Sequence, residues 1–297
     1  MTSPAARGAA SSTAGGAPRF VDLHSHSTAS DGALAPEDVI ARARSAGLTA
    51  VALTDHDTLA GIPAAREAGK RLGVRVVAGV ELSAVDGDRE LHLLGLHIAR
   101  VDTLEQELAA FREARHARAV RIVERLNKLA VPVTLDAILR ESAGGAIGRP
   151  HIARAMVAGG WVRDQREAFD RFLGYGRPAF VAKRKLTVGD AVRLVHDSGG
   201  ICVFAHPGQE GTRSKLEALR GLGLDGVEVR HPSHSTEDVA RLLALADHLG
   251  LVPSGGSDWH GAAEGPRTLG AMQVPHEWLD RQDARVAERQ KLAQTTA

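Results

Sequence analysis

Short apolar runs alternate with amphipathic stretches along most of the chain. Between residues 20 and 95, runs such as RFVDLH and TAVALTD are separated by the helix-like segments PEDVIARARSAG and IPAAREAGKRLG. The alternation resumes after residue 186 with VGDAVRLVHDSGG, ICVFAHP and LDGVEVRHP. Pro36 near a helix start, and Gly47 and Gly73 just past helix ends, mark the expected boundaries. The pattern predicts parallel strands with crossover helices, and about seven strand candidates favour a closed barrel over an open sheet.

One part of the chain interrupts this alternation. LEQELAAFREARHARAVRIVERLNKLA has the periodicity of one long amphipathic helix, and LDAILRESAG and RPHIARAMVAGG follow it without a convincing strand between them. We therefore expect a helical insertion over residues 101–185, between barrel segments at 20–100 and 186–275. Residues 1–19, rich in Ala, Ser, Gly and Pro, are expected to form a disordered tail, and residues 276–297 a C-terminal tail.

Composition and charge exclude several classes of protein. The 37 basic and 36 acidic residues leave a formal charge of +1, so net charge predicts neither a polyanion partner nor binding to a DNA duplex. The single cysteine, Cys202, excludes an internal disulfide and a thiolate metal cluster, and it favours a cytoplasmic location. Residues 1–19 contain no apolar stretch typical of a signal peptide or a membrane span, so no membrane association is expected.

Histidines and carboxylates close nearly every predicted strand. The residues at or near strand ends are His24, His26, Asp55, His56, Glu81, His206, His231, His234, Asp258 and His260, and His92 lies within LHLLGL. In a parallel barrel the carboxyl ends of the strands meet on one face. Side chains alternate along a strand, so His24 and His26 point to the same side. A single such histidine is usually only hydrogen-bonded, but this repetition indicates a metal centre.

Six motifs, HSHSTASDG, LTDHDT, GVELS, ELHLLG, FAHPG and SDWH, resemble in order and spacing those of the PHP family, named for polymerase and histidinol phosphatase. The resemblance covers residues 20–100 and 186–262. It implies a distorted (β/α)7 barrel, an α/β fold, with a helical insertion subdomain that covers the active site. The insertion, with GRPHIARAMV, is similar to that of phosphatases acting on nucleoside 3′,5′-bisphosphates, and some relatives trim short RNA from its 5′ end.

The resemblance also implies two to three divalent metal ions and their ligands. Carried over position by position, the ligands form three sets: His24, His26, Glu81 and Asp258; Glu81, His92 and His206, with Glu81 bridging; and Asp31, His56 and His260. Imidazole and carboxylate ligands without sulfur suit manganese, iron or zinc. Manganese is the first expectation, with iron or zinc as alternatives.

The chemistry of such a centre favours phosphate esters. Three divalent ions with three ligand carboxylates keep a charge of roughly +3, which attracts phosphate. A metal-bound hydroxide is expected to attack phosphorus while the other ions stabilise the remaining oxygens. No Cys-His pair or GxSxG motif among the strand-end residues argues for covalent catalysis. We therefore expect hydrolysis of phosphate monoesters, above all of the 3′-phosphate of nucleoside 3′,5′-bisphosphates.

Further residues are candidates for catalysis or substrate binding. Asp57 can hydrogen-bond substrate or orient a metal ligand, although it also stands where an acceptor would cap a helix near Leu59. His231 and His234 exceed the ligand set; either can act as an acid for the leaving group or line the rim, and we take His234 as the catalytic candidate. Substrate contacts are expected from Arg115, Arg118, Arg149, His151 and Lys183. Arg149 resembles the family's phosphate-contacting arginine and suits a second phosphate.

Three alternatives remain open at this point. The same metals would serve a 5′-3′ exoribonuclease, and aromatics at only 3 % favour a small nucleotide or the 5′ end of a short RNA over long strands. Histidinol phosphate is a rival substrate, less favoured because of the insertion. A non-catalytic module that binds metal or nucleotide is the least favoured hypothesis.

Overall fold

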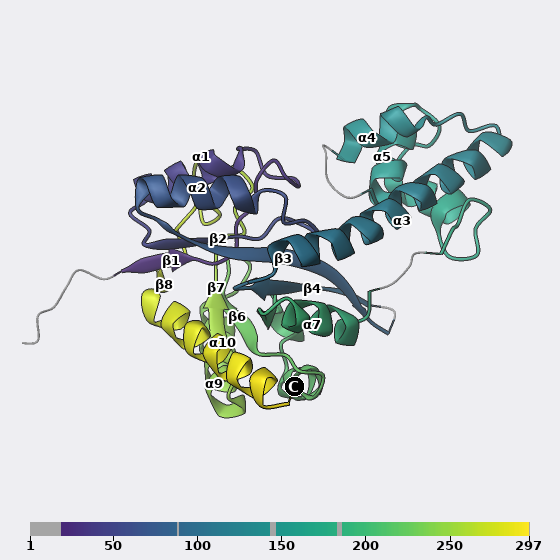
Figure 1. The fold of residues 1–297 in the computed structure, drawn as a ribbon. Helices are drawn as coiled ribbons and strands as arrows, with labels where there is room; N and C mark the ends of the chain where they lie inside the picture. Colours follow the sequence, from purple (N-terminus) through teal and green to yellow (C-terminus); the bar gives the residue numbers. More distant parts are fainter. Residues whose placement is uncertain (1–18, 88, 143–146, 183–185, 297) are drawn as a thin grey trace, which may run out of the picture.

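The computed structural model of the protein describes residues 19–87, 89–142, 147–182 and 186–296 (Figure 1). The tail expected over residues 1–19 lies outside the described residues except for Arg19. The described strands form one sheet in the order β7-β6-β5-β4-β3-β2-β1-β8. They are β1 (Phe20–Asp22), β2 (Ala50–Leu53), β3 (Arg75–Asp86), β4 (Arg89–Leu96), β5 (Ile201–Phe204), β6 (Gly226–Arg230), β7 (Val252–Gly255) and β8 (Val274–Pro275).

The sheet curls until the segments that follow β1 and β7 meet. The Leu23 N–H donates to the Gly255 carbonyl at 3.0 Å, and the His26 N–H donates to the Trp259 carbonyl at 2.9 Å. Gly256 permits this approach, because a Cβ at that position would lie 2.4 Å from the backbone nitrogen of His24. These contacts close the barrel beside His24 and confirm the predicted distorted α/β barrel.

The sheet is mixed, so the prediction of parallel strands is wrong for β4, and a short strand that was not predicted, β8, is also antiparallel to its neighbour. β4 runs antiparallel to both β3 and β5, and β8 runs antiparallel to β1. The connection from Asp86 to Arg89 contains two residues, which suits a hairpin and is far too short for a crossover helix. His92 therefore lies within an antiparallel strand, opposite Ser83, and not at a strand end.

Helices cover the outside of the barrel. They are α1 (Pro36–Ser45), α2 (Ile62–Leu72), α7 (Val188–Asp197), α8 (Arg213–Gly221), α9 (Thr236–Leu249) and α10 (His276–Thr296), with a short 3₁₀ turn at Gly208–Glu210. The predicted boundaries hold, because Pro36 is the first residue of α1 and Gly73 caps α2 in the left-handed conformation at φ 69°. Among the described helices, none is both long and apolar enough to cross a membrane.

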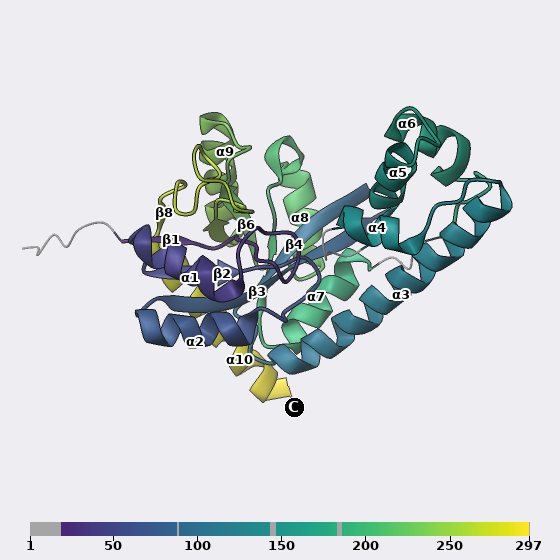
Figure 2. The same cartoon turned by 90° about the horizontal axis from the view of Figure 1, so that it is seen from above.

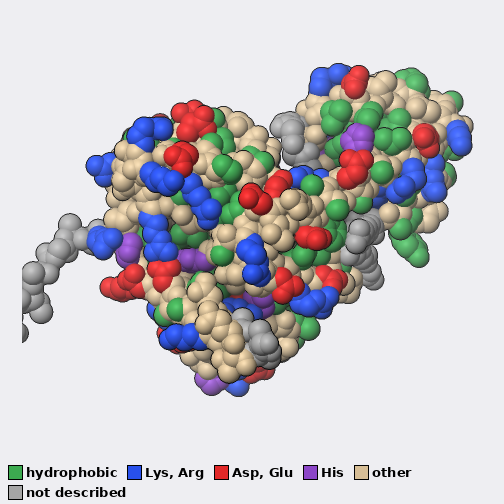
Figure 3. Space-filling model, viewed as in Figure 1, with side chains coloured by type: hydrophobic (Ala, Val, Ile, Leu, Met, Phe, Trp, Pro, Cys, Tyr) green, Lys and Arg blue, Asp and Glu red, His purple; other side chains and the backbone are tan. Residues whose placement is uncertain are grey.

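The insertion has a hydrophobic core of its own. It comprises α3 (Val101–Lys128), α4 (Leu135–Ser142), α5 (Arg149–Ala158), α6 (Gln165–Ala168) and the π-helical turn η1 (Phe169–Leu173). The first half of α3 buries Leu104 and Leu108 in the barrel core, whereas the second half buries Ile122 and Leu126 in the core of the insertion. Figure 2 shows α3 running from one body to the other, and Figure 3 shows the insertion as a separate lobe joined by a narrower neck.

The C-terminal segment includes the helix α10. The sequence predicted only a tail over residues 276–297. This helix packs on the barrel and buries Trp278, Leu279 and Gln282. The Gln282 amide donates to the Pro253 carbonyl of β7 at 3.1 Å. α10 therefore forms part of the wall of the barrel, on the side of β7 and β1.

Candidate metal centre

A buried carboxylate shapes the loop that carries the first ligands. Asp55 follows β2 and accepts three hydrogen bonds of 2.7 Å, from the Ser27 N–H, the Ser27 hydroxyl and the Ser30 hydroxyl. The loop after β1 is thereby held against the end of β2. His24 and His26 point into the barrel mouth, and Asp31, further along the loop, turns back toward them.

The first predicted set comes together at the centre of the barrel mouth. His24 Nε2 lies 3.1 Å from Glu81 Oε2 and 3.4 Å from Asp258 Oδ1, and His26 Nε2 lies 3.3 Å from each of the same two oxygens. Ligand atoms about 2.1 Å from a tetrahedral metal ion lie roughly 3.4 Å apart. The four donor atoms therefore have the spacing of a metal site.

His26 supplies a second indication that the residues fit a metal ion. Its side chain is fully buried, yet neither ring nitrogen has a hydrogen-bond partner among the described residues. A buried polar atom without a hydrogen bond is costly, and a metal ion bound at one ring nitrogen, with the proton kept on the other, would reduce that cost. The two ring nitrogens face different groups of candidate ligands, because Nε2 lies beside Glu81 and Asp258 whereas Nδ1 lies beside Asp31.

Glu81 divides its two oxygens between groups of histidines. Oε2 faces His24 and His26 and lies 3.4 Å from His56 Nδ1. Oε1 lies 2.7 Å from His92 Nδ1 and 3.0 Å from His206 Nε2. The carboxylate is 1 % exposed. Glu81 therefore contacts both groups of histidines, one with each oxygen.

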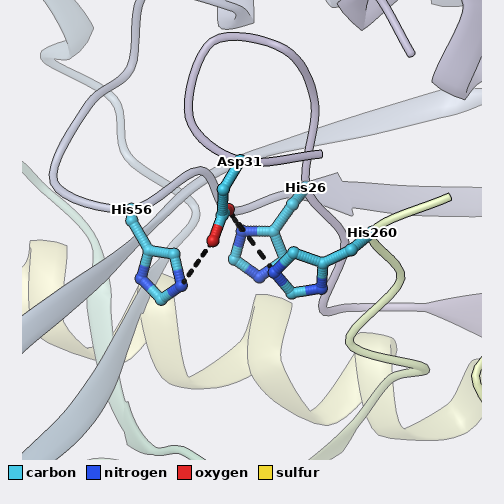
Figure 4. A group of neighbouring side chains, drawn as sticks. All are labelled: His26, Asp31, His56 and His260. Atoms are coloured by element: carbon cyan, nitrogen blue, oxygen red, sulfur yellow. Dashed lines mark ion pairs between the residues drawn. The ribbon is translucent and has the colours of Figure 1, made fainter. Parts of the chain in front are cut away.

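The third group gathers around Asp31 (Figure 4). Its carboxylate lies 3.4 Å from His260 Nε2, 3.8 Å from His56 Nε2 and 3.7 Å from His26 Nδ1. The donor atoms of these four residues all lie within 4.8 Å of one another. The resemblance implied only Asp31, His56 and His260 for this set, so His26 is an addition that touches two groups.

Burial and close contacts between histidines and carboxylates shift the pKa values of the groups in the centre. Burial alone would lower the pKa of His24, but the Glu228 and Glu81 carboxylates raise it well above its ordinary value. Burial likewise opposes protonation of His26, and Asp258 and Glu81 nevertheless raise its pKa to about 9. Burial would raise the pKa of Glu81, but His24 and the other histidines hold it well below its usual range. In the metal-free protein, protons on these histidines therefore supply positive charge beside the buried carboxylates.

Two buried acids that the sequence analysis did not select support the centre. Glu228 is fully buried in β6; Oε1 lies 3.1 Å from His24 Nδ1, and Oε2 accepts the His206 N–H at 2.6 Å. Asp22 of β1 accepts the N–H groups of Ser257 at 3.0 Å and Gly270 at 2.8 Å. Each is an acid inside an otherwise apolar strand run, VEV or FVDL, and that is the signal that would have indicated both.

The structure separates the two histidines that follow β6. His231 Nε2 lies 3.3 Å from Asp258 Oδ2, an oxygen that also contacts the Arg267 guanidinium. His234, the catalytic candidate, accepts the Gly208 N–H at Nε2 and contacts the Val229 carbonyl through Nδ1. Both of its ring nitrogens thus contact the backbone in this structure, and a catalytic role for His234 stays a prediction.

A cavity of about 390 Å³ joins the metal centre to the insertion. Asp31, His56 and Asp57 line it from the barrel. The predicted substrate residues that line it from the insertion are Arg115, Arg118, Arg149 and His151. Lys183, the remaining candidate, lies outside the described residues.

Comparison with known proteins identifies similar sequences and folds. The PHP domain model matches residues 22–134. The chain is 37 % identical over 260 residues to a 3′,5′-nucleoside bisphosphate phosphatase of Chromobacterium violaceum, covering 84 % of this chain and 90 % of that protein. It is 38 % identical over 247 residues to the 5′-3′ exoribonuclease Rnm of Escherichia coli, covering 80 % and 84 %. A solved structure from Bifidobacterium adolescentis, described as a metal-dependent phosphoesterase, is 33 % identical, has a TM-score of 0.69 and covers 90 % of this chain and 97 % of its own.

Replacing Glu228 by glutamine tests its support of the metal ligands. The change keeps the side-chain volume but removes the charge beside His24, so we expect the affinity for Mn²⁺ to fall roughly 10- to 100-fold. Calorimetric titration of the metal-stripped protein measures this affinity, and circular dichroism checks that the fold persists. Glu37→Gln, at an exposed position of α1, is the control. Equal affinities in the two variants would contradict the role of Glu228.

The apparent affinity for Mn²⁺ should also depend on pH. A metal ion binds only neutral imidazole, and the raised pKa keeps His26 protonated in the metal-free protein at neutral pH. We expect the affinity to rise as the pH increases toward about 9, the range over which His26 loses its proton. Titrations in a series of buffers, together with the protons released on loading, measure the effect. An affinity that is constant across this range would show that protons do not compete with the metal.

Proposed function

This chain belongs to the PHP family and is a metal-dependent phosphoesterase, and from that premise we propose that it removes the 3′-phosphate from nucleoside 3′,5′-bisphosphates. The observation that carries the proposal is the cavity that connects the metal centre with three arginines of the insertion. A bisphosphate has two anionic groups, one for each end of this cavity. Bound divalent ions supply an activated water and charge neutralisation at the reacting phosphate.

Arg118 is the main support for a second anion site. It is 7 % exposed, and its Nε donates to the Val181 carbonyl at 2.8 Å. Burial, together with the neighbouring Arg149, Arg115 and Arg121 charges, lowers its pKa to about 10, with Glu90 offsetting this in part. Among the described residues no ion pair joins Arg118 or Arg149 to a carboxylate. A buried cation without a paired anion favours an anionic ligand.

Arg149 is oriented for such a ligand. Its guanidinium lies near two aromatic rings, 5.6 Å from the centroid of Phe169 and 5.5 Å from that of Phe180. One of its nitrogens, Nη1, donates to the Leu173 carbonyl at 3.1 Å. The guanidinium is thus held by two cation–π contacts and one hydrogen bond, and its other donors can pair with two phosphate oxygens.

Asp57 and His151 complete the proposed substrate site. Asp57 Oδ2 lies 2.7 Å from Arg115 Nη1, so we assign Asp57 the role of positioning Arg115 beside the metal ligand His56. His151 Nδ1 accepts the Gly148 N–H at 3.0 Å. In the neutral ring this leaves Nε2 with the proton, available as a donor to a substrate oxygen.

The proposal also covers the ligands and the identity of the metal ions. We assign the nine side chains of the three ligand sets to two or three ions, with Glu81 as the bridge and Mn²⁺ as the preferred ion, Fe²⁺ or Zn²⁺ being alternatives. The second candidate function is a 5′-3′ exoribonuclease acting on short RNA. It is favoured by the equal similarity to a phosphatase and to an exoribonuclease.

Phosphate release by the purified protein, stripped of metal and resupplied with Mn²⁺, tests the proposed substrate. We expect kcat/KM to be highest for adenosine 3′,5′-bisphosphate, compared with histidinol phosphate and a 5′-phosphorylated short RNA. Rapid shortening of the RNA with little turnover of the bisphosphate would favour the exoribonuclease. Turnover of histidinol phosphate above both would refute the proposed nucleotide substrate.

Arg149→Ala tests the second phosphate site. Loss of a charge-assisted contact should raise KM for the bisphosphate roughly 10- to 100-fold. Hydrolysis of adenosine 3′-monophosphate, which has no second phosphate, should change little. Arg171→Ala removes an exposed arginine of the insertion that pairs with Glu167 and serves as the control. Equal losses on both substrates would show that Arg149 does not recognise the second phosphate.

A further inference from the structure

An exposed aromatic side chain stands beside the substrate cavity. Tyr175, the one tyrosine of the chain, is 91 % exposed. Its ring meets Phe180 edge to face, with centroids 5.4 Å apart and an interplanar angle of 64°. Tyr175 lies in the turn GYGRP that follows η1, where Gly176 adopts φ 72°. The ring is thus supported by one aromatic contact, and at 91 % exposure at least one of its faces is open to solvent.

The aromatic pair continues the wall of the cavity. The guanidinium of Arg149 makes a cation–π contact with Phe180, and Arg149 lines the cavity. The backbone at Phe180 is held in place because its carbonyl accepts from the Arg125 guanidinium, while the next carbonyl, of Val181, accepts from Arg118. A continuous path therefore runs from the metal centre past Arg149 and Phe180 to the ring of Tyr175.

The chemistry along this path suits single-stranded nucleic acid. Such strands bind to surfaces that combine cations for the phosphates with aromatic faces for the bases. Arg118, Arg149 and Arg125 supply the cations, and Tyr175 supplies the open face. An amphipathic ring isolated among cations offers too little apolar area for a lipid surface or an apolar protein segment.

We propose that Tyr175, supported by Phe180, stacks an unpaired nucleobase of a short RNA whose adjacent phosphate lies at Arg149. The inference rests on the proposed nucleotide phosphoesterase function of the metal centre. It adds a subsite beyond the residues that line the cavity, for a base of a longer strand and not for that of the bisphosphate. The subsite would let one metal centre serve both a mononucleotide and a short RNA.

The first test compares two substrates of the Mn²⁺-loaded full-length protein. With 5′-phosphorylated pentaadenylate, Tyr175→Ala and Tyr175→Leu should raise KM roughly 5- to 100-fold, because each loses the aromatic face. Tyr175→Phe keeps the face and should resemble the wild type. All three variants should hydrolyse adenosine 3′,5′-bisphosphate as the wild type does. Unchanged pentaadenylate kinetics in Tyr175→Ala, or equal losses on both substrates, would overturn the inference.

Removal of single bases from the RNA locates the contact. Pentamers with one abasic nucleotide are compared for the wild type and Tyr175→Ala. At one position the abasic change should raise KM for the wild type and have little further effect in the variant, since both changes remove the same stacking contact. If the increases in KM caused by the abasic nucleotide and by Tyr175→Ala simply multiply at every position, direct stacking is refuted.

A binding measurement keeps the inference separate from catalysis. Since the chain has one tyrosine, protein labelled with 3-fluorotyrosine gives a single fluorine resonance. Pentaadenylate added to the metal-stripped protein, which does not cleave it, should shift this resonance, and a resonance that stays in place at saturation would overturn the inference. If the loaded protein hydrolyses neither nucleotide substrate, the proposed function fails, while the fluorine signal still decides the role of Tyr175.

Discussion

One buried carboxylate organises the whole metal centre. The two oxygens of Glu81 contact five imidazoles, which come from the β1 loop, the β2 loop, β4 and the segment after β5. A carboxylate so deeply buried is stable only if positive charge surrounds it. The barrel closes where the segments after β1 and β7 meet. The first segment carries His24 and His26, and the second carries Asp258, whose Oδ1 lies within 3.4 Å of the same two imidazoles. Closure therefore brings Asp258 beside the histidines that Glu81 contacts.

Much of the barrel and its centre was predictable from local sequence. Short apolar runs indicate the strands. Residues that follow them, such as His24 and Asp258, are expected on one face of the barrel, because the carboxyl ends of parallel strands meet there. The antiparallel direction of β4 was missed because pairing between strands is a non-local property that periodicity does not report. Glu228 was missed for a related reason, since its importance depends on two histidines at distant positions of the chain.

The substrate side was less predictable than the metal side. The stripe of arginines on α3 indicates a helical flank, but it does not say which members face the barrel. The structure distinguishes them by their contacts: Arg115 pairs with Asp57, Arg118 is buried with no carboxylate paired to it in the described part of the chain, and Arg125 bonds to the Phe180 backbone. Whether a helix face meets solvent or a second body depends on the orientation of the whole insertion.

The division of α3 between two hydrophobic cores has an evolutionary consequence. Residues that stabilise the insertion, such as Ile122 and Leu126, belong to a cluster that shares no member with the barrel core. Selection can therefore remodel the insertion while the barrel and its ligands stay under their own constraints. Descendants of one ancestral hydrolase can diversify in substrate range by changing this lobe alone, because the reactive chemistry is inherited in the other.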